Sequence, residues 1–142
     1  MSQGLKITLK GGERIYIKGT VLKMDRKVGI ELLNDATFLL EQHILQPEAA
    51  TTPLRQLYFM VQMMLIDPSL HAKARDMANE TIAALKATTS NEDITKGLND
   101  VTRLLAADRT LEALKRIRGL YPTEADCMKA DANADKLQKE VA

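Results

Sequence analysis

Cysteine, tryptophan and long apolar runs are scarce or missing in this chain of 142 residues. Its one cysteine, Cys127, cannot form an intrachain disulfide, and such sparse use of cysteine fits a reducing cytoplasm. No apolar stretch reaches the roughly 20 residues that a bilayer-spanning helix needs. The N-terminal segment MSQGLKITLK also lacks the apolar core of a secretory signal. We therefore expect a soluble, cytoplasmic protein that does not enter a membrane.

Motifs for catalysis and for metal or nucleotide binding are missing as well. The two histidines, His43 and His71, fall in different halves of the chain and have no cluster of partners at metal-ligand spacing. No glycine-rich phosphate loop is present, and Gly11-Gly12 is typical of a hairpin turn. No acid–base or nucleophile–base pair stands out. The sequence thus predicts a protein that is not an enzyme and that uses no metal or cofactor.

Positive charge is concentrated near the N-terminus. The whole chain has a formal net charge of +1, but residues 5–27 contain seven basic and two acidic residues, a local net of +5. The basic residues are Lys6, Lys10, Arg14, Lys18, Lys23, Arg26 and Lys27. The chain therefore has a local basic stripe without being a polycation.

Residues 5–45 alternate between apolar and polar side chains. In LKITLK, Leu5, Ile7 and Leu9 share one face, and RIYIK continues the pattern with Ile15 and Ile17. TVLKM, VGIELL and ATFLLE follow, separated by turns that contain glycine, asparagine or aspartate. Short strands at this spacing predict an antiparallel meander that curls into a small barrel or sandwich, which needs a covering layer.

From residue 52 the apolar period becomes helical. Thr52 can cap a helix and Pro53 suits its first position, which predicts a helix over 53–66. Further helices are expected over about 68–87, 92–106 and 109–120, with Asp108 as the cap of the last. After Pro122 the apolar residues are small or sparse, so the tail is expected to dock weakly or to fray.

The predicted fold is therefore α+β, with two parts. Residues 1–48 form a small antiparallel β-barrel or meander with a basic face. Residues 49–142 form a helical domain of about four helices plus the tail, packed as helical hairpins.

The helix at 53–66 is apolar on almost every side, and such a helix must be buried on more than one side. One stripe consists of Leu54, Leu57, Tyr58, Val61, Met64 and Leu65, and it is expected to join the two halves. The second consists of Phe59, Met60, Met63 and Ile66. This second stripe either completes the core or binds a partner or a second copy of the chain, because adjacent methionines suit an adaptable surface.

The basic stripe suggests RNA binding. The alternation places Lys6, Lys10, Arg14 and Lys18 on the outer face of neighbouring strands, with Tyr16 among them. The cations then hold phosphates while the tyrosine ring stacks on a base. The complete candidate set is Lys6, Lys10, Arg14, Tyr16, Lys18, Lys23, Arg26 and Lys27. The alternative is that these lysines only keep the strands soluble and protect their edges.

Two segments resemble the FlbT family of bacterial regulators of flagellum biosynthesis. LKITLKGGERIYIKGTVL is similar to the family's N-terminal pattern of a short basic strand and glycine-containing turns. ILQPEAATTPLRQLYFMVQMMLID is similar to its most characteristic run, which leads into an aromatic and methionine-rich helix. The resemblance covers residues 4–120 and is most specific at 44–67, whereas the alanine-, lysine- and aspartate-rich tail departs from the family pattern.

The resemblance implies a regulator that acts after transcription on flagellin synthesis. It implies association with the 5′ untranslated region of flagellin mRNA and an effect on its stability or translation, repressing in some bacteria and activating in others. It also implies work alongside FlaF, a small helical protein. A rival hypothesis is a protein-binding adaptor that captures a FlaF-like protein or flagellin and affects RNA only indirectly. A homodimer seam along residues 57–66 is a third.

Overall fold

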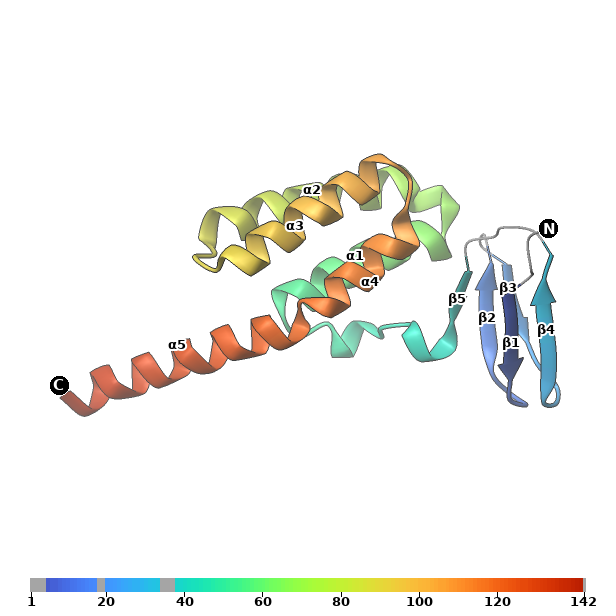
Figure 1. The fold of residues 1–142 in the computed structure, drawn as a ribbon, viewed down its shortest axis with the longest axis horizontal. Helices are drawn as coiled ribbons and strands as arrows, with labels where there is room; N and C mark the ends of the chain where they lie inside the picture. Colours follow the sequence, from blue (N-terminus) through green and yellow to red (C-terminus); the bar gives the residue numbers. More distant parts are fainter. Residues whose placement is uncertain (1–4, 18–19, 34–37, 142) are drawn as a thin grey trace.

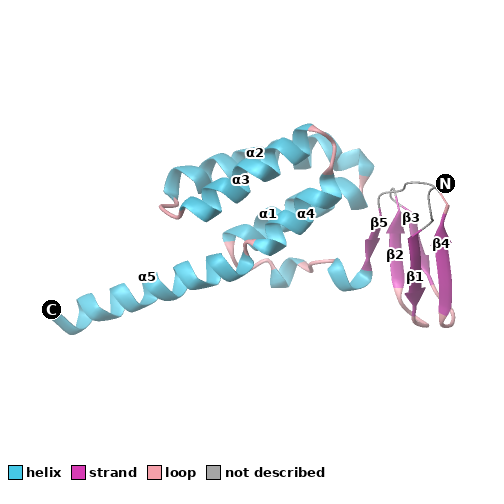
Figure 2. Cartoon of the chain, in the orientation of Figure 1, coloured by secondary structure: helices cyan, strands magenta, loops and turns pink. Residues whose placement is uncertain are grey.

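The fold is given by a computed structural model, which describes residues 5–17, 20–33 and 38–141. Within these ranges the chain forms five strands at one end and five α-helices that follow them (Figures 1 and 2). The predicted α+β class, with antiparallel strands first and helices second, is confirmed.

The strands form two small antiparallel sheets. They are β1 (Leu5–Leu9), β2 (Arg14–Ile17), β3 (Thr20–Lys23), β4 (Val28–Leu32) and β5 (Phe38–Leu40). β1 pairs with β4, and β2 lies between β3 and β5. In the described part of the chain these sheets do not close into a barrel, so the expected barrel or meander is an open arrangement.

β1 to β4 are one long hairpin that bends in the middle. Residues 5–17 run antiparallel to residues 20–32 in a single register, from Leu5 opposite Leu32 to Ile17 opposite Thr20. Gly12 lies at the bend with a φ of 84°, a conformation that glycine adopts at little cost. Its N–H donates to the Met24 carbonyl at 2.7 Å, which holds the two arms together at the bend. Consecutive strands β1 and β2 therefore belong to different sheets.

The three-stranded sheet is covered on both faces along its central strand β2, whereas the edge strand β3 is exposed. Leu9 of β1 and Ile15 of β2 are both fully buried, although neither belongs to the helical core, which indicates that the two sheets cover each other's apolar faces. On the opposite face, Tyr16 pairs with Leu39 of β5, and both side chains pack against the helical core. The strands and helices thus share buried contacts at the junction.

The helices form a bundle around α1. They are α1 (Pro53–Ile66), α2 (His71–Thr88), α3 (Glu92–Ala106), α4 (Thr110–Gly119) and α5 (Tyr121–Val141). α1 lies against α2 and α4, and α3 lies against both α4 and α2. The fully buried side chains of the bundle include Leu57, Val61, Leu98, Val101, Leu114 and Ile117. The helical period predicted these elements to within a few residues.

Local capping explains where the helices begin, with one correction. Thr52 Oγ1 accepts the Arg55 N–H at 3.2 Å, as the expected cap of α1 does. Asp108 was predicted to cap α4, but it has a φ of 57° and ends α3 instead. Its N–H donates to the Leu105 carbonyl at 3.2 Å and the next N–H, of Arg109, to the Leu104 carbonyl at 2.8 Å. Aspartate tolerates the left-handed conformation that this helix-ending motif requires.

α5 docks by its first turns and then leaves the bundle (Figure 1). Tyr121 packs against the helical core and Glu124 is buried, whereas residues 128–133 are exposed. α5 remains a single helix to Val141. The tail therefore docks at its start only, and its far end projects away from the other helices.

Candidate functional site

Five basic residues lie in or next to the two turns at the bend of the hairpin, which is the lower end of the strands in Figure 1. We call this surface the basic tip: Lys10, Arg14, Lys23, Arg26 and Lys27, all exposed. Two turns meet there, because the Met24 N–H donates to the Glu13 carbonyl at 3.0 Å. Arg14 and Lys23 face each other across β2 and β3. The fold thus converts a stripe in the sequence into a compact cationic end.

Acidic groups offset only part of this charge. Glu13 and Asp25 lie in the two turns, and Glu41 Oε2 accepts the Arg14 N–H at 3.0 Å. The Glu13 carboxylate is occupied by the Lys10 N–H at 2.9 Å, and the exposed contact of Asp25 with Arg26 is 3.9 Å long. An exposed pair at that distance contributes little energy and competes weakly with another anion. The tip therefore keeps a positive excess that is available to phosphate groups.

Two of the predicted RNA-binding residues, Lys6 and Tyr16, lie elsewhere. Lys6 is exposed on β1 and faces Glu31 of β4. This pair lies three positions along the strands from Leu9 and Val28, which border the tip. Tyr16 is half-buried against the helical core, so its ring is not among the lysines as expected. The reason is the bend, which puts β2 in a second sheet whose polar face turns toward the helices. Lys18 lies outside the described residues.

Gln62, the one polar residue in the middle of α1, forms hydrogen bonds to the linker that follows the strands. Its side chain is 1% exposed. The Leu45 N–H donates to Gln62 Oε1 at 2.7 Å, and Gln62 Nε2 donates to the Leu45 carbonyl at 2.9 Å. The amide thereby satisfies both backbone groups of a linker residue, as a neighbouring strand does. A single glutamine among apolar residues suggests a buried polar contact, but nothing in the sequence identifies Leu45 as its partner.

A second link joins the linker to α4. The Tyr58 hydroxyl donates to the His43 carbonyl at 2.7 Å and accepts from Arg118 Nη1 at 3.0 Å. Burial raises the pKa of Tyr58, and the Arg118 charge opposes that rise. Burial lowers the pKa of His43, and the charges of Arg118 and Lys115 lower it further. His43 therefore stays neutral near pH 7 between two permanent cations.

α4 carries a basic run that the sequence interpretation missed. Lys115, Arg116 and Arg118 fall within four positions of the segment LKRIRG. Arg116 Nε donates to Asp100 Oδ2 of α3 at 3.0 Å, whereas Arg118 turns toward Tyr58. The signal for this run is local in the sequence, with three cations and no acidic residue between Lys115 and Arg118. It adds cations beside the linker that leads from the basic tip.

The second stripe of α1 borders an apolar groove. Phe59, Met60 and Met63 line it together with residues from the start of α2, and its volume is about 190 Å³. Met77 and Leu70 on its walls are 45% and 38% exposed. Ile66 does not line the groove; it packs partly against the core, as Met60 and Met63 also do. Three of the four predicted partner-binding residues thus come together on one partly exposed surface.

The described residues contain neither a metal-binding group nor a membrane span. No three side chains among their histidines, cysteines, aspartates and glutamates come together as metal ligands. None of the described helices combines the length and the apolar character that crossing a bilayer requires.

Sequence comparison identifies the family to which this chain belongs. A family model described as "Flagellar protein FlbT" matches residues 5–128, which extends the expected resemblance beyond residue 120. The chain belongs to the FlbT family. No solved structure is a significant match.

Curated relatives are similar over nearly their whole length. A protein of Chelativorans sp. (strain BNC1) is 50% identical over 92% of this chain and 90% of its own length. One of Agrobacterium fabrum is 44% identical over 100% of this chain and 98% of its own length. One of Rhizobium leguminosarum bv. trifolii is 52% identical over 87% of this chain and 83% of its own length. Each is named "Probable flagellum biosynthesis repressor protein FlbT".

Proposed function

We propose that this protein regulates flagellum biosynthesis by binding the 5′ untranslated region of flagellin mRNA through the basic tip. The names of the relatives support the regulatory role. The observation that carries the RNA-binding step is the gathering of five exposed cations around two turns that hold only two acidic residues. The proposal puts the protein's action in the cytoplasm, where the mRNA is.

Phosphate contacts supply the affinity in this proposal. Lysine and arginine at an exposed turn can follow the backbone of a single strand or loop without reading its sequence. The protein then changes the access of ribosomes or nucleases to the leader, and no catalytic step by its own residues is needed. The half-buried Tyr16 is left out of the binding surface, because its ring packs against the core.

The salt dependence of binding gives a quantitative test. Each phosphate contact to a single strand contributes a slope of about −0.7 to the logarithm of affinity against the logarithm of salt concentration. Five contacts at the tip predict a slope of about −3.5. Fluorescence anisotropy with a labelled flagellin leader, measured over a range of KCl concentrations, determines it.

A pair of double variants tests the location. Lys23→Glu with Lys27→Glu reverses two charges at the tip, and Lys86→Glu with Lys129→Glu makes the same change in net charge on α2 and α5. We expect the first to lose about two contacts, and so to flatten the slope by about 1.4, while the second keeps the wild-type slope. Equal effects of both double variants contradict the assignment to the tip.

The groove beside α1 favours a second candidate function, that of an adaptor which binds a protein. An apolar groove with exposed Met77 and flanking Lys73 suits one face of an amphipathic helix, such as a FlaF-like protein or a segment of flagellin offers. Calorimetry with the purified partner is the test. Met63→Glu should abolish this binding, and the affinity should depend weakly on salt. Light scattering on the protein alone tests the homodimer, which requires a dimer at micromolar concentration.

A further inference from the structure

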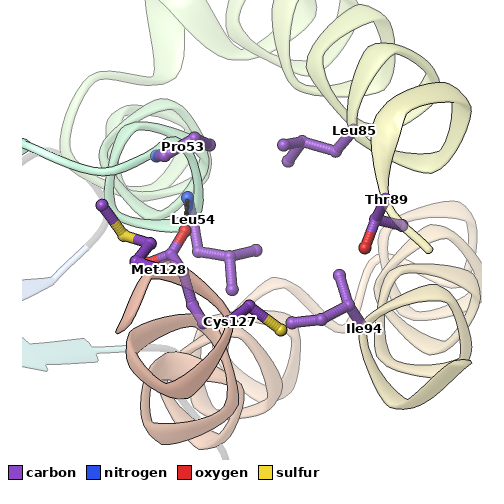
Figure 3. A pocket seen from close by; sticks show the side chains of 8 residues that line it. Pro53, Leu54, Leu85, Thr89, Ile94, Cys127 and Met128 are labelled. Atoms are coloured by element: carbon purple, nitrogen blue, oxygen red, sulfur yellow. Dashed lines mark hydrogen bonds between the residues drawn. The ribbon is translucent and has the colours of Figure 1, made fainter. Parts of the chain in front are cut away.

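An apolar pocket opens where α5 crosses the start of α1 and the turn between α2 and α3 (Figure 3). Its volume is about 220 Å³, and its walls include Leu54, Leu85, Ile94, Cys127 and Met128. Leu54 and Ile94 are buried, whereas Met128 is 49% exposed at the rim. Side chains from four helices therefore form the walls of this pocket.

The pocket contains a buried carboxylate with a free acceptor. Glu124 is 7% exposed and lines the pocket. Its Oε2 accepts the Leu54 N–H at 2.9 Å, which caps α1 from a residue of α5. Its Oε1 is buried and has no hydrogen-bond partner among the described residues. A buried carboxylate oxygen without a donor is costly, so it favours a ligand that brings one.

The nearest cation does not fill this role. Arg55 Nη1 forms an ion pair with Glu124 Oε1 at 3.8 Å, which is too long for a hydrogen bond. The Arg55 guanidinium instead lies over the Tyr121 ring, 4.4 Å from its centroid. Stacking thus holds Arg55 to one side of the carboxylate.

The two kinds of surface define the ligand. Apolar walls suit an aliphatic chain, and the carboxylate suits a cationic donor at its end. A lysine side chain combines four methylenes with an ammonium group that carries three donors. A free diamine of similar length would bring a second charge against the apolar rim. Because Glu124 Oε1 is buried, the ammonium reaches it only if a side chain at the rim rotates, and Met128, one helical turn after Glu124, has a flexible thioether.

We propose that this pocket binds a lysine side chain presented by a partner protein. The site is separate from the basic tip and does not depend on RNA binding. The family match extends to Met128, the last residue of the pocket wall, so the pocket lies entirely within the matched region.

Matched small probes test the proposal on the full-length protein. Nα-acetyl-lysine methylamide carries the lysine side chain, Nα-acetyl-norleucine methylamide keeps an aliphatic chain without the ammonium, and putrescine is a free diamine. Each is titrated while amide signals of Leu54, Cys127 and Met128 are followed by NMR. We expect the lysine derivative to shift these signals and to bind at least about tenfold more tightly than the norleucine derivative, as a charge-assisted hydrogen bond predicts. Equal binding of the two, or no shift with either, overturns the proposal. Tighter binding of putrescine also overturns it, in favour of a free polyamine.

Two variants separate the contribution of the carboxylate from that of the walls. Glu124→Gln keeps an oxygen that can accept the Leu54 N–H but removes the charge, so it should abolish the preference for lysine over norleucine. Leu85→Phe narrows the opposite wall and should weaken both derivatives. Circular dichroism confirms that each variant is folded before titration. A Glu124→Gln protein that is folded and still prefers lysine contradicts the proposed role of the carboxylate.

Discussion

Replacing Gln62 with leucine removes the amide that links α1 to Leu45. The two hydrogen bonds measure 2.7 and 2.9 Å, and the side chain is 1% exposed. The variant leaves the Leu45 N–H and carbonyl without partners at a half-buried position, where each unpaired group costs about 1–1.5 kcal/mol. The apolar leucine recovers about 1 kcal/mol by its own burial. We therefore expect a net loss of about 1–2 kcal/mol in the free energy of unfolding.

Urea unfolding followed by circular dichroism measures this loss. With a slope of about 2 kcal/mol per molar urea, in the middle of the usual range, the midpoint should fall by roughly 0.5–1 M. Gln56→Leu is the matched control, because Gln56 is exposed on the same helix and its replacement should change stability by less than about 0.5 kcal/mol. Hydrogen exchange of the Leu45 amide should also become faster in Gln62→Leu. If Gln62→Leu unfolds at the same urea concentration as Gln56→Leu, the linking role of this amide is refuted.

Two further predictions concern packing and protonation. A Cβ on Gly97 would come within 2.9 Å of Leu120 Cγ, so Gly97→Ala should destabilise the protein by about 1–3 kcal/mol in thermal unfolding, whereas Gly119→Ala, with no atom within 4 Å, should not. The pKa of His43 is lowered, chiefly by burial and then by the Arg118 charge, so the unfolded state binds more protons than the folded state below pH 6.5. The free energy of unfolding should therefore fall as the pH drops through and below 6.5. His43→Asn should lose this part of the decrease, which urea midpoints measured across pH would show. Parallel curves of midpoint against pH for the two proteins contradict this role of His43.

The helices could be predicted from sequence because their signals are local. Thr52 and Pro53 mark the start of α1, and the apolar period gives its end at Ile66. Asp108 is the instructive failure. An aspartate can open one helix or, in the left-handed conformation, close the one before it, and only the neighbouring backbone hydrogen bonds decide between them.

Strand pairing and the site were less accessible to sequence reasoning. Alternation shows which side chains share a face, but it does not identify the neighbouring strand. The bend at Gly12 moves β2 out of the sheet of β1, so Tyr16 turns toward the helices and away from Lys6. The role of Glu124 could not be predicted from the sequence for a different reason. Its partner is a backbone N–H of Leu54, 70 residues earlier, and every residue except proline has such a group.

The single register of the bent hairpin also restricts how the gene can change in length. Residues 10–13 and 24–27 face each other at the bend, between two ladders that keep the same alignment. Inserting one residue in only one of these turns shifts one ladder by one position and turns either Leu9 or Ile15 outward. We expect homologous chains to gain or lose residues at both turns together, or at neither, while the amino acids within the turns remain free to vary.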